Sequence, residues 1–337
     1  MRTILVSRFS AFGDVIISVK VLKAVLEQNP DVNIILLTKK PFAFLFADIS
    51  RLSVSAPALN GRHKGVLGLY KLSRELKDSN IEAYADIHDV LRTKVLSLFL
   101  CLQGIKIRKI RKGRIAKRRL TRRHNKILKP LKNSAERYAD VFRKLGLTVD
   151  LSQVSSLAVR VSEKISSNFL NSKVTKIGIA PFSVHKQKEY PNEKMVELME
   201  LLSQKGVHVF IFGGGKKEEQ RANKMIAGIK NAQSIIGKYS LPEELQIISL
   251  MDGMLTMDSA NMHLASLTDT EVYTIWGATH PLAGFGPFQN PNYHTIQLPA
   301  EELTCRPCSV YGNKKCFRGD LACLYNINPK DIVQKLL

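Results

Sequence analysis

Asp14 is the first acidic residue of the chain and stands where a carboxylate could do chemistry. It follows an apolar run at residues 3–7 and a turn that carries Ser10, and it lies near the start of an amphipathic segment that ends at Asn29-Pro30. This pattern predicts a strand, a tight turn and a helix. A carboxylate at such a turn either interacts with the helix macrodipole or serves as a general base at the mouth of a sheet. The turn alone leaves both readings open.

Polar residues that could hold a phosphate follow a second apolar run, at residues 176–180. Ser183 comes just after this run, and Lys186 and Lys188 precede a predicted helix. A hydroxyl group, lysines and a helix N-terminus are groups that bind phosphate. The later turn Gly213-Gly214-Gly215 would let the backbone approach a ligand closely, although it lacks the spacing of the dinucleotide fingerprint.

A third group of candidate residues follows the apolar run at residues 253–257. Asp258 comes directly after this run, and its side chain can cap the helix that we predict next. The backbone N–H groups of the following residues, which include Ser259 and Ala260, would then point at an anion. His263 comes about one turn later, on the same side as Ser259. A lone histidine is usually a packed or surface residue, but this one follows a strand end.

Apolar periodicity predicts two series of strands and helices that would position these groups. Strands are expected at 3–7, 33–37, 52–56, 83–87, 176–181, 208–212, 253–257 and 272–276, and helices at 15–28, 69–77, 94–103, 192–205, 217–229, 241–249 and 261–267. Such alternation indicates doubly wound parallel sheets, in which ligands bind outside the carboxyl ends of the strands. We therefore predict two α/β domains in tandem.

The length of the chain agrees with this division, because 337 residues correspond to about two domains of average size. We predict domains at 1–160 and 161–337, with the boundary between Leu147 and Thr175. A basic block and residues 150–156 are expected to form an irregular connection. The longest apolar run, near residues 95–102, is too short for a membrane span, and residues 1–8 are apolar too briefly for a signal peptide. We expect a cytoplasmic protein, either free or held on a membrane surface.

Charge is the most unusual feature of the composition: Lys and Arg number 51 against 29 Asp and Glu, a net charge of +22. No acidic residue occurs from Val90 to Ala135, and the basic block at 106–132 carries Lys106, Arg108, Lys109, Arg111, Lys112, Arg114, Lys117, Arg118, Arg119, Arg122, Arg123, Lys126, Lys129 and Lys132. Such a block is either a solvated, mobile loop or a surface for nucleic acid, anionic lipid or a phosphorylated substrate. It has no aromatic residue on which single-stranded bases could stack, which disfavours nucleic acid.

Several motifs resemble those of the lipopolysaccharide heptosyltransferases, glycosyltransferase family 9. Gly13-Asp14-Val15-Ile16, preceded by Arg8-x-Ser10, is similar to the start of that family, and Lys188-Glu189-Tyr190-Pro191 to its Lys-x-aromatic-Pro motif. The most specific similarity is the segment from Asp258 to Ala265, followed after one strand by Trp-Gly-Ala-Thr-His-Pro at 276–281. The resemblance extends from Met1 to about Asp331. It implies the GT-B fold, with two facing Rossmann-like domains, parallel sheets and an active site in the cleft between them.

The resemblance also implies an activity and the residues that perform it. Family members move a heptose from ADP-heptose to the inner core of lipopolysaccharide and invert the configuration at its anomeric carbon. By resemblance, Asp14 is the catalytic base and the donor ligands are Ser183, Lys188, Glu219, Tyr239, Asp258, Ser259, Ala260 and His263. Domain 1–160 would bind the acceptor and domain 161–337 the donor. We expect no metal and no cofactor: the chain has no Asp-x-Asp motif, so lysine, hydroxyl and N–H groups would stabilise the leaving diphosphate.

Within the donor set the resemblance assigns separate roles. Ser183 and Lys188 are similar to diphosphate ligands, Glu219 to the acid that holds the ribose, and Tyr239 to an apolar residue near the adenine. The loop at 258–263 would cradle the diphosphate and the sugar.

The chain departs from the family pattern at Ala260, where glycine is usual, and at His280, where aspartate is usual. These departures leave the identity of the donor sugar open. A second reading is a non-catalytic RNA-binding protein that uses the basic block at 106–132. The transferase reading predicts as partners a nucleotide-sugar donor, a phosphorylated glycolipid acceptor and the anionic inner-membrane surface, and no nucleic acid.

The cysteines form two sets with different expectations. Cys101 stands alone in a predicted apolar helix, so we expect it in the core. Cys305, Cys308, Cys316 and Cys323 cluster near the end of the chain. In a cytosolic protein this spacing suggests a small zinc site, and in a secreted one disulfides. By resemblance it is also a cysteine-bearing tail of the family with no established metal.

Overall fold

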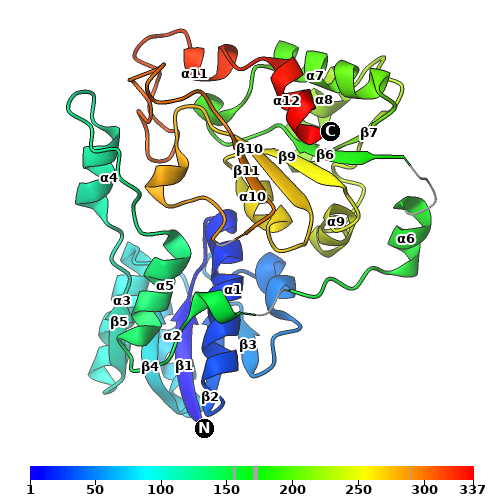
Figure 1. Cartoon of the computed structure of the whole chain (residues 1–337). Helices are drawn as coiled ribbons and strands as arrows, with labels where there is room; N and C mark the ends of the chain where they lie inside the picture. The colour runs from blue at the N-terminus through cyan, green and yellow to red at the C-terminus, as the bar shows by residue number, and fades with distance from the viewer. Residues whose placement is uncertain (155–156, 170–173, 289) are drawn as a thin grey trace. The chain divides into compact units, whose positions relative to one another are not determined.

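A computed structural model of the chain describes residues 1–154, 157–169, 174–288 and 290–337. The chain divides into two compact units, coloured along the chain in Figure 1. Unit 1 comprises Met1–Lys112 and Lys132–Ser155, and unit 2 comprises Gly113–Leu131 and Ser156–Leu337. Most of the basic block therefore belongs to unit 2, although the chain on either side of it belongs to unit 1.

The strands of unit 1 form a parallel sheet in the order β3-β2-β1-β4-β5. They are β1 (Arg2–Ser7), β2 (Val32–Leu37), β3 (Leu52–Ser55), β4 (Ile81–Asp86) and β5 (Lys106–Lys109). The order reverses between β1 and β4, because β2 and β3 extend the sheet on one side of β1 and β4 and β5 on the other. In doubly wound sheets such a reversal is where ligands bind, at the carboxyl ends of the two strands.

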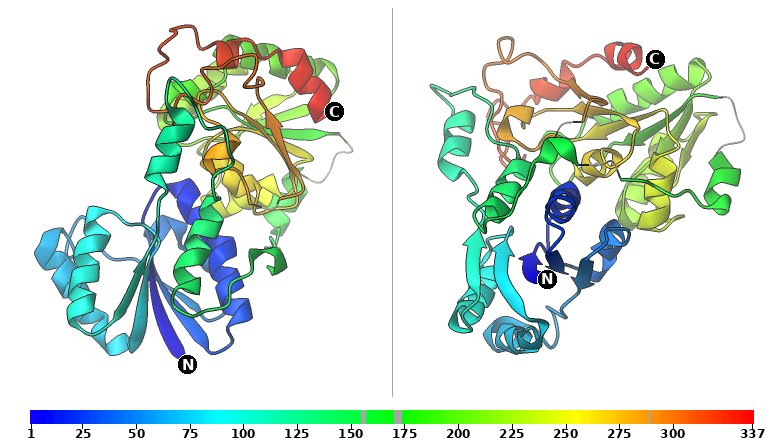
Figure 2. Two further views of the ribbon diagram at one scale, coloured as in Figure 1. Left: turned by 60° about the vertical axis from the view of Figure 1, so that its left-hand side comes forward. Right: turned by 60° about the horizontal axis from the view of Figure 1, so that its bottom comes forward.

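Helices cover both faces of this sheet, as Figure 2 shows. On one face α1 (Phe12–Gln28) packs against α5 (Ser134–Arg143), and on the other α2 (Gly65–Glu75) packs against α3 (Leu91–Leu102). Short 3-10 turns are η1 (Lys40–Phe46), η2 (Lys77–Ser79) and η3 (Leu151–Gln153). Leucines on the inner side of α2 and α3 pack around Leu5 and Tyr84 of the sheet, so burial of this apolar stripe holds both helices in place.

The strands of unit 2 form a second parallel sheet, in the order β11-β10-β9-β6-β7-β8. They are β6 (Lys176–Ala180), β7 (His208–Ile211), β8 (Ala232–Ser234), β9 (Gly253–Met257), β10 (Glu271–Ile275) and β11 (Tyr293–Ile296). Here the order reverses between β6 and β9. A side chain at Gly178 of β6 would place its Cβ 2.0 Å from the Met254 sulfur, so close packing at this reversal requires glycine.

The helices of unit 2 are α4 (Arg114–Thr121), α6 (Glu163–Phe169), α7 (Asn192–Gln204), α8 (Gly215–Met225), α9 (Leu241–Ile248), α10 (Ala260–Ala265), α11 (Ala322–Tyr325) and α12 (Pro329–Leu336), with 3-10 turns η4 (Lys186–Lys188) and η5 (Pro281–Ala283). Helix α12 packs against α7, next to α8, and α10 packs against α9 on the other face of the sheet (Figure 1). Helices thus cover each face of the sheet. This agrees with the strands β6 and β9, in which almost every residue is buried.

The predicted alternation of strands and helices is confirmed. Each element expected in the two series is present, although α2 begins at Gly65 rather than residue 69, α3 at Leu91 rather than 94, and α8 ends at Met225 rather than 229. Elements that the periodicity did not reveal include β8, β11, α6 and α12. Of these, β8 has three residues and β11 four, too few to show a period.

The prediction of an irregular connection at the basic block is wrong. This stretch contains β5 and α4, and it leads into α5, which begins at Ser134. In α4 the buried residues Lys117, Leu120 and Thr121 form one face. A lysine occupies a buried position there, so a count of apolar residues could not find this face. Residues 155 and 156 of the expected connection lie outside the described residues.

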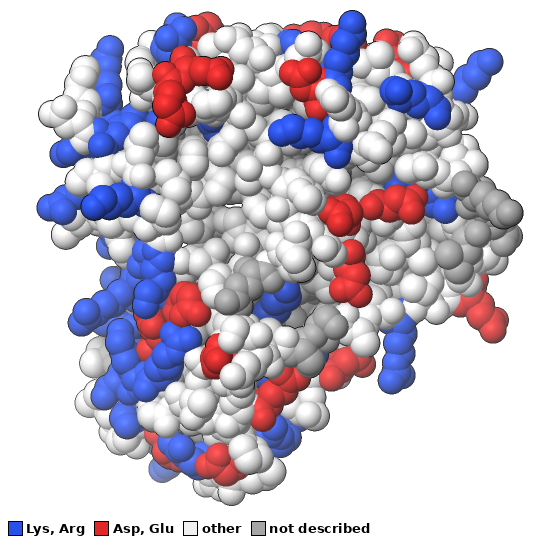
Figure 3. Space-filling view, in the orientation of Figure 1, with Lys and Arg blue, Asp and Glu red and all other residues white. Residues whose placement is uncertain are grey.

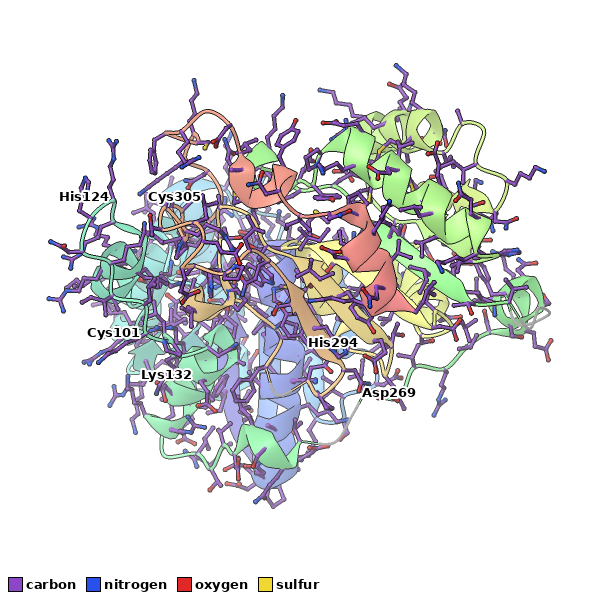
Figure 4. The ribbon with its side chains drawn as sticks, turned by 45° about the horizontal axis from the view of Figure 1, so that its top comes forward. Cys101, His124, Lys132, Asp269, His294 and Cys305 are labelled. Carbon is purple, nitrogen blue, oxygen red and sulfur yellow. The ribbon has the colours of Figure 1, made fainter. Side chains whose placement is uncertain are left out.

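The prediction that Cys101 lies in the core is also wrong, because its side chain is exposed on α3 (Figure 4). Helix α3 buries Thr93, Leu96 and Leu100, and Cys101 lies to one side of this buried face. Among the described residues, no helix is both long enough and apolar enough to cross a membrane.

Candidate active site

The candidate catalytic carboxylate lies in unit 1 beside the strand-order reversal. Asp14 is in the first turn of α1, after the loop that follows β1. Its carboxylate pairs with Nη2 of Arg8 and accepts a hydrogen bond of 3.1 Å from the hydroxyl of Tyr138 in α5. The Asp14 side chain is 28% exposed and that of Arg8 only 8%. The carboxylate is thus held from the protein side and remains accessible from solvent.

Arg8 is itself fixed by groups from several elements. Its Nη1 donates to the carbonyl oxygen of Ile87, after β4, at 2.7 Å. Its guanidinium carbon lies 5.4 Å from the centre of the Tyr138 ring, within the range of a cation–π interaction. A buried arginine held in this way orients its carboxylate partner more strictly than an exposed ion pair would.

His88 lies next to this ion pair. Its Nε2 is 3.3 Å from the hydroxyl oxygen of Ser10, and its backbone N–H donates to Oδ1 of Asp86 at 3.0 Å. Burial lowers the pKa of His88 to about 4, and the positive charge of Arg8 acts in the same direction. His88 is therefore uncharged at neutral pH and leaves Arg8 as the cation beside Asp14.

The candidate donor ligands lie at the strand-order reversal of unit 2. Lys188 follows β6 in η4, Asp258 directly follows β9, and their side chains form an ion pair of 2.9 Å between Nζ and Oδ2. Both side chains are largely buried, at 14% and 8% exposed. Low solvent exposure strengthens the attraction between them. The structure thus brings together two residues that the sequence analysis assigned to one ligand.

A second ion pair supports the loop that carries Ser183. The carboxylate of Glu189 accepts a hydrogen bond of 2.9 Å from the backbone N–H of Ser183 and pairs with Arg221 of α8, also at 2.9 Å. The Arg221 guanidinium lies 4.6 Å from the centre of the Phe182 ring. This network fixes the backbone between β6 and η4, so Ser183 and Lys188 are held in one loop.

The prediction that Asp258 caps the following helix is wrong. Helix α10 begins at Ala260, after Ser259, and it has no side-chain cap; Asp258 pairs with Lys188 instead. The hydroxyl oxygen of Ser259 is buried and has no hydrogen-bond partner among the described atoms. Because an unpaired buried hydroxyl is unfavourable, this group is suited to bind a polar ligand. His263, one turn on, is buried in α10.

Glu219 and Tyr239, the predicted nucleoside ligands, come from neighbouring positions in unit 2. A Cβ on Gly237 would lie 3.8 Å from Oε2 of Glu219, so the acid of α8 borders the loop that leads to Tyr239. The Tyr239 ring meets Phe169 of α6 edge-on, with 6.0 Å between ring centres. Glu219 thus lies beside the loop in which Tyr239 follows Gly237 by two residues, while the Tyr239 ring packs on α6.

Residues of the C-terminal tail to which no sequence motif pointed support the Lys188 loop. Arg306 is fully buried and donates to the carbonyl oxygens of Gly277 at 2.8 Å and Trp276 at 2.9 Å, which ties the tail to the loop after β10. Gly312 has a φ of +77°, and a Cβ there would lie 2.4 Å from Cδ of Lys188. The tail thus packs directly on the lysine. No local pattern could reveal contacts between segments so far apart in the chain.

The basic segment Gly113–Leu131 is docked on unit 2 rather than being a loose loop. The buried Lys117 ammonium lies 4.1 Å from the centre of the Phe285 ring, and Lys126 donates to the carbonyl oxygens of Cys305 at 3.0 Å and Pro307 at 3.2 Å. Figure 4 labels Cys305 of the tail and His124 of the basic segment. The outward side chains of the segment include Arg118, Arg119, Arg122, Arg123 and Lys129. In Figure 3, basic side chains gather over α4.

The tail cysteines do not fit the zinc site that their spacing suggested. All are free thiols, with Cys323 buried and Cys305, Cys308 and Cys316 partly exposed. Burial raises the pKa of Cys323 to about 12, so this thiol is protonated at neutral pH in the structure described. In the part of the chain that the structure describes, no group of three or more His, Cys, Asp or Glu side chains is arranged to hold a metal ion.

Two doubly wound parallel sheets, each with a pair of opposite charges near its strand-order reversal, place this chain among the α/β proteins whose ligands bind at the strand ends. The comparison with protein families is more specific. The chain belongs to glycosyltransferase family 9 (heptosyltransferase), whose model matches residues 69–314.

The chain is also similar in sequence to individual heptosyltransferases. A stretch of 132 residues is 25% identical to lipooligosaccharide heptosyltransferase 2 of Campylobacter jejuni and covers 38% of this chain and 40% of that protein. A longer stretch, of 288 residues, is 23% identical to the lipopolysaccharide core heptosyltransferase OpsX of Haemophilus influenzae and covers 83% of this chain and 80% of that protein.

Solved structures share the fold over the whole chain. The Escherichia coli ADP-heptose lipopolysaccharide heptosyltransferase II has a TM-score of 0.71 at 18% identity, with 100% of this chain and 97% of that one covered. Escherichia coli heptosyltransferase WaaC, in complex with ADP-2-deoxy-2-fluoro heptose, has a TM-score of 0.69 at 17% identity, with 99% and 98% covered. The predicted family and the GT-B class of two parallel-sheet α/β domains are confirmed.

Replacing His88 by Gln should make the stability of the protein less sensitive to acid. The pKa of His88 is about 4 in the folded chain, against 6.5 for an unperturbed histidine. Between these pH values His88 binds a proton in the unfolded chain but not in the folded one. The free energy of unfolding therefore falls as the pH is lowered from 6.5 to 4. Denaturant unfolding of His88→Gln at several pH values should therefore give a shallower decline than the wild type.

A change at an exposed histidine, His124→Gln, serves as the control and should keep the wild-type decline. If His88→Gln and the wild type lost stability in parallel over this pH range, the buried, uncharged state assigned to His88 would be incorrect.

Proposed function

We propose that this chain is an inverting heptosyltransferase that moves a heptose from ADP-heptose to an acceptor in the inner core of lipopolysaccharide. The observation that carries the proposal is the buried Lys188–Asp258 pair, with the unpartnered Ser259 hydroxyl next to Asp258, in a chain of glycosyltransferase family 9. The fluorinated ADP-heptose bound to WaaC supports ADP-heptose as the donor, and the names of the curated relatives support lipopolysaccharide as the destination.

Asp14 is the proposed catalytic base. Its carboxylate would take the proton of an acceptor hydroxyl while that oxygen attacks the anomeric carbon of the sugar, and the bond from this carbon to the diphosphate oxygen would break. Attack from the face opposite the leaving group inverts the configuration. The pairing with Arg8 and the hydrogen bond from Tyr138 support this role because they orient the carboxylate before the acceptor arrives.

The leaving nucleoside diphosphate gains negative charge in the transition state, and unit 2 supplies groups to stabilise it. In the proposal, Lys188, Ser183 and Ser259 contact the diphosphate and His263 helps to neutralise it. Asp258 and the backbone at Ala260 shape the loop that holds the sugar. A lysine already fixed by an ion pair needs no rearrangement during the reaction, which is the condition for effective electrostatic stabilisation. We propose that transfer is independent of a metal, since the chain carries no Asp-x-Asp motif.

The two units would divide the substrates between them. Unit 1, which contains Asp14, would bind the acceptor, and unit 2 the donor, with Glu219 at the ribose and Tyr239 near the adenine. The position of Glu219 beside Gly237, two residues before Tyr239 in the chain, supports this assignment.

Replacing Asp14 by Asn should abolish transfer while leaving donor binding intact. Loss of a general base costs roughly 10²–10⁴ in rate, whereas the donor groups of unit 2 are unchanged. The measurement is a transfer assay with ADP-heptose and a lipid A precursor, together with a thermal-shift titration of ADP-heptose. A saturating donor should stabilise both the wild type and the variant by about 2–3 kcal/mol.

Glu27→Gln, at the other end of α1, is the matched control and should retain full transfer. Undiminished turnover by Asp14→Asn would remove Asp14 as the base. If a screen of nucleoside diphosphates and their sugars stabilised neither protein, the transferase proposal itself would be wrong.

We propose that the docked basic segment contacts the phosphorylated glycolipid acceptor and the anionic surface of the inner membrane. Its contacts with Phe285, Cys305 and Pro307 hold the helix α4 in place, so its outward arginines form a fixed positive surface. Each cation near an anionic bilayer contributes about 1 kcal/mol to binding.

Changing Arg118, Arg119, Arg122 and Arg123 together to Gln should weaken binding to anionic vesicles at least tenfold at low salt, because about four such contributions are lost. Co-sedimentation with vesicles that contain phosphatidylglycerol measures this. The control changes four exposed lysines of unit 2 to Gln: Lys205, Lys216, Lys224 and Lys230. Binding that survives the arginine changes at low salt would contradict a membrane role for this segment.

A further inference from the structure

The helix α3 is apolar on both of its long sides. Its inner side buries Thr93, Leu96 and Leu100. Its outer side carries Leu91, Leu98 and Leu102, which are 79%, 59% and 77% exposed. Together with the half-buried Val95, these residues recur at intervals of three and four and form one stripe. A helix that covers only a soluble core has polar residues there, so this stripe calls for an explanation.

The neighbouring helix α2 continues the apolar surface. Val66, Leu67 and Tyr70 are 60%, 78% and 47% exposed. The Tyr70 ring meets Phe99 of α3 edge-on, with 5.4 Å between ring centres, so the two outer surfaces are joined rather than separate. Both helices lie on the same face of the unit 1 sheet (Figure 2). Contiguous exposed leucines on adjacent helices mark an interaction surface rather than scattered surface residues.

The charges around this surface are positive. Exposed basic residues on and beside the two helices are Lys64, Lys71, Arg74, Arg92 and Lys94. Helix α3 contains no acidic residue, and Glu75, the acid of α2, is already paired with Arg62 and His63. The acids beside the helices are Asp89, which pairs with Lys94, and the exposed Asp78, so the cations remain in excess. An apolar stripe bordered by cations matches the interface of an anionic bilayer, where leucines enter the acyl region and lysines and arginines meet the headgroups.

The same charges disfavour a second copy of this chain as the partner. A symmetric dimer through this face would place the same patch on both subunits. The cations that border the patch, among them Arg92 and Lys71, would then be present on both subunits and would meet cations rather than acids around an apolar centre. A bilayer with anionic headgroups offers an apolar region for the leucines and negative charges for the cations.

We propose that the outer faces of α2 and α3 form a membrane-docking surface that inserts leucines into a bilayer containing anionic phospholipid. This surface belongs to unit 1 and is distinct from the basic segment of unit 2. It differs in mechanism, because insertion of apolar side chains is not screened by salt. The inference goes beyond the proposed sugar transfer and does not depend on which sugar or acceptor the site uses.

The test is flotation of the full chain with vesicles of phosphatidylcholine alone and of phosphatidylcholine with phosphatidylglycerol, at low and high salt. The wild type should bind the anionic vesicles and keep part of this binding in high salt. Leu98→Gln with Leu102→Gln should reduce the fraction bound in high salt at least fivefold. Tyr325→Gln with Leu337→Gln changes two exposed apolar residues of unit 2, 44% and 57% exposed, and should bind like the wild type.

Circular dichroism and thermal unfolding serve to check that both double variants fold. Equal flotation of Leu98→Gln/Leu102→Gln and the wild type would overturn the proposal, as would an absence of wild-type binding to any vesicle. Sedimentation velocity identifies the remaining alternative: a wild-type dimer that the double variant cannot form, with no difference in flotation, would show that the leucines contact a second copy. Asp14→Asn should float like the wild type, so failure of docking and failure of transfer are distinguished.

Discussion

Two ion pairs hold the candidate site residues of this chain, and each lies where the strand order of its own sheet reverses. Arg8 and Asp14 follow β1 beside β4, and Lys188 and Asp258 follow β6 and β9. At such a reversal the loops from adjacent strands lead to opposite faces of the sheet, and the strand ends can receive a ligand. Tyr138 holds the carboxylate of Asp14, and the tail packs on Lys188 at Gly312.

The pairing of each charge has a chemical consequence. A buried lysine or carboxylate without a partner would lose its charge or destabilise the fold. Asp258 keeps the Lys188 ammonium compensated before the donor binds, and Arg8 does the same for the carboxylate of Asp14. The site can therefore carry the charges that catalysis requires while it is empty. In the proposed reaction, the diphosphate of the donor would meet a cation that is already oriented, which would limit the reorganisation during sugar transfer.

Much of this arrangement could be predicted from the sequence because it depends on local patterns. The short apolar runs and the polar residues directly after them placed Asp14, Ser183 and Asp258 at strand ends, and the family motifs added their roles. What could not be predicted depends on contacts between distant segments. Tyr138 reaches Asp14 from a helix 124 residues away, and Gly312 packs on Lys188 from the tail. In α3, leucines occur on both sides, so periodicity could not tell which side faces the core, and Cys101 was placed wrongly.

The central claim is that the Lys188 ammonium, held by Asp258, binds the diphosphate of the donor. Calorimetric titration of ADP-heptose into the wild type and Lys188→Gln tests it directly, with Lys186→Gln, an exposed lysine of the same turn, as the control. A charge-assisted hydrogen bond contributes roughly 1.5–3 kcal/mol, so Lys188→Gln should bind the donor at least tenfold more weakly and Lys186→Gln nearly as well as the wild type. Equal affinity of Lys188→Gln and the wild type would contradict the account.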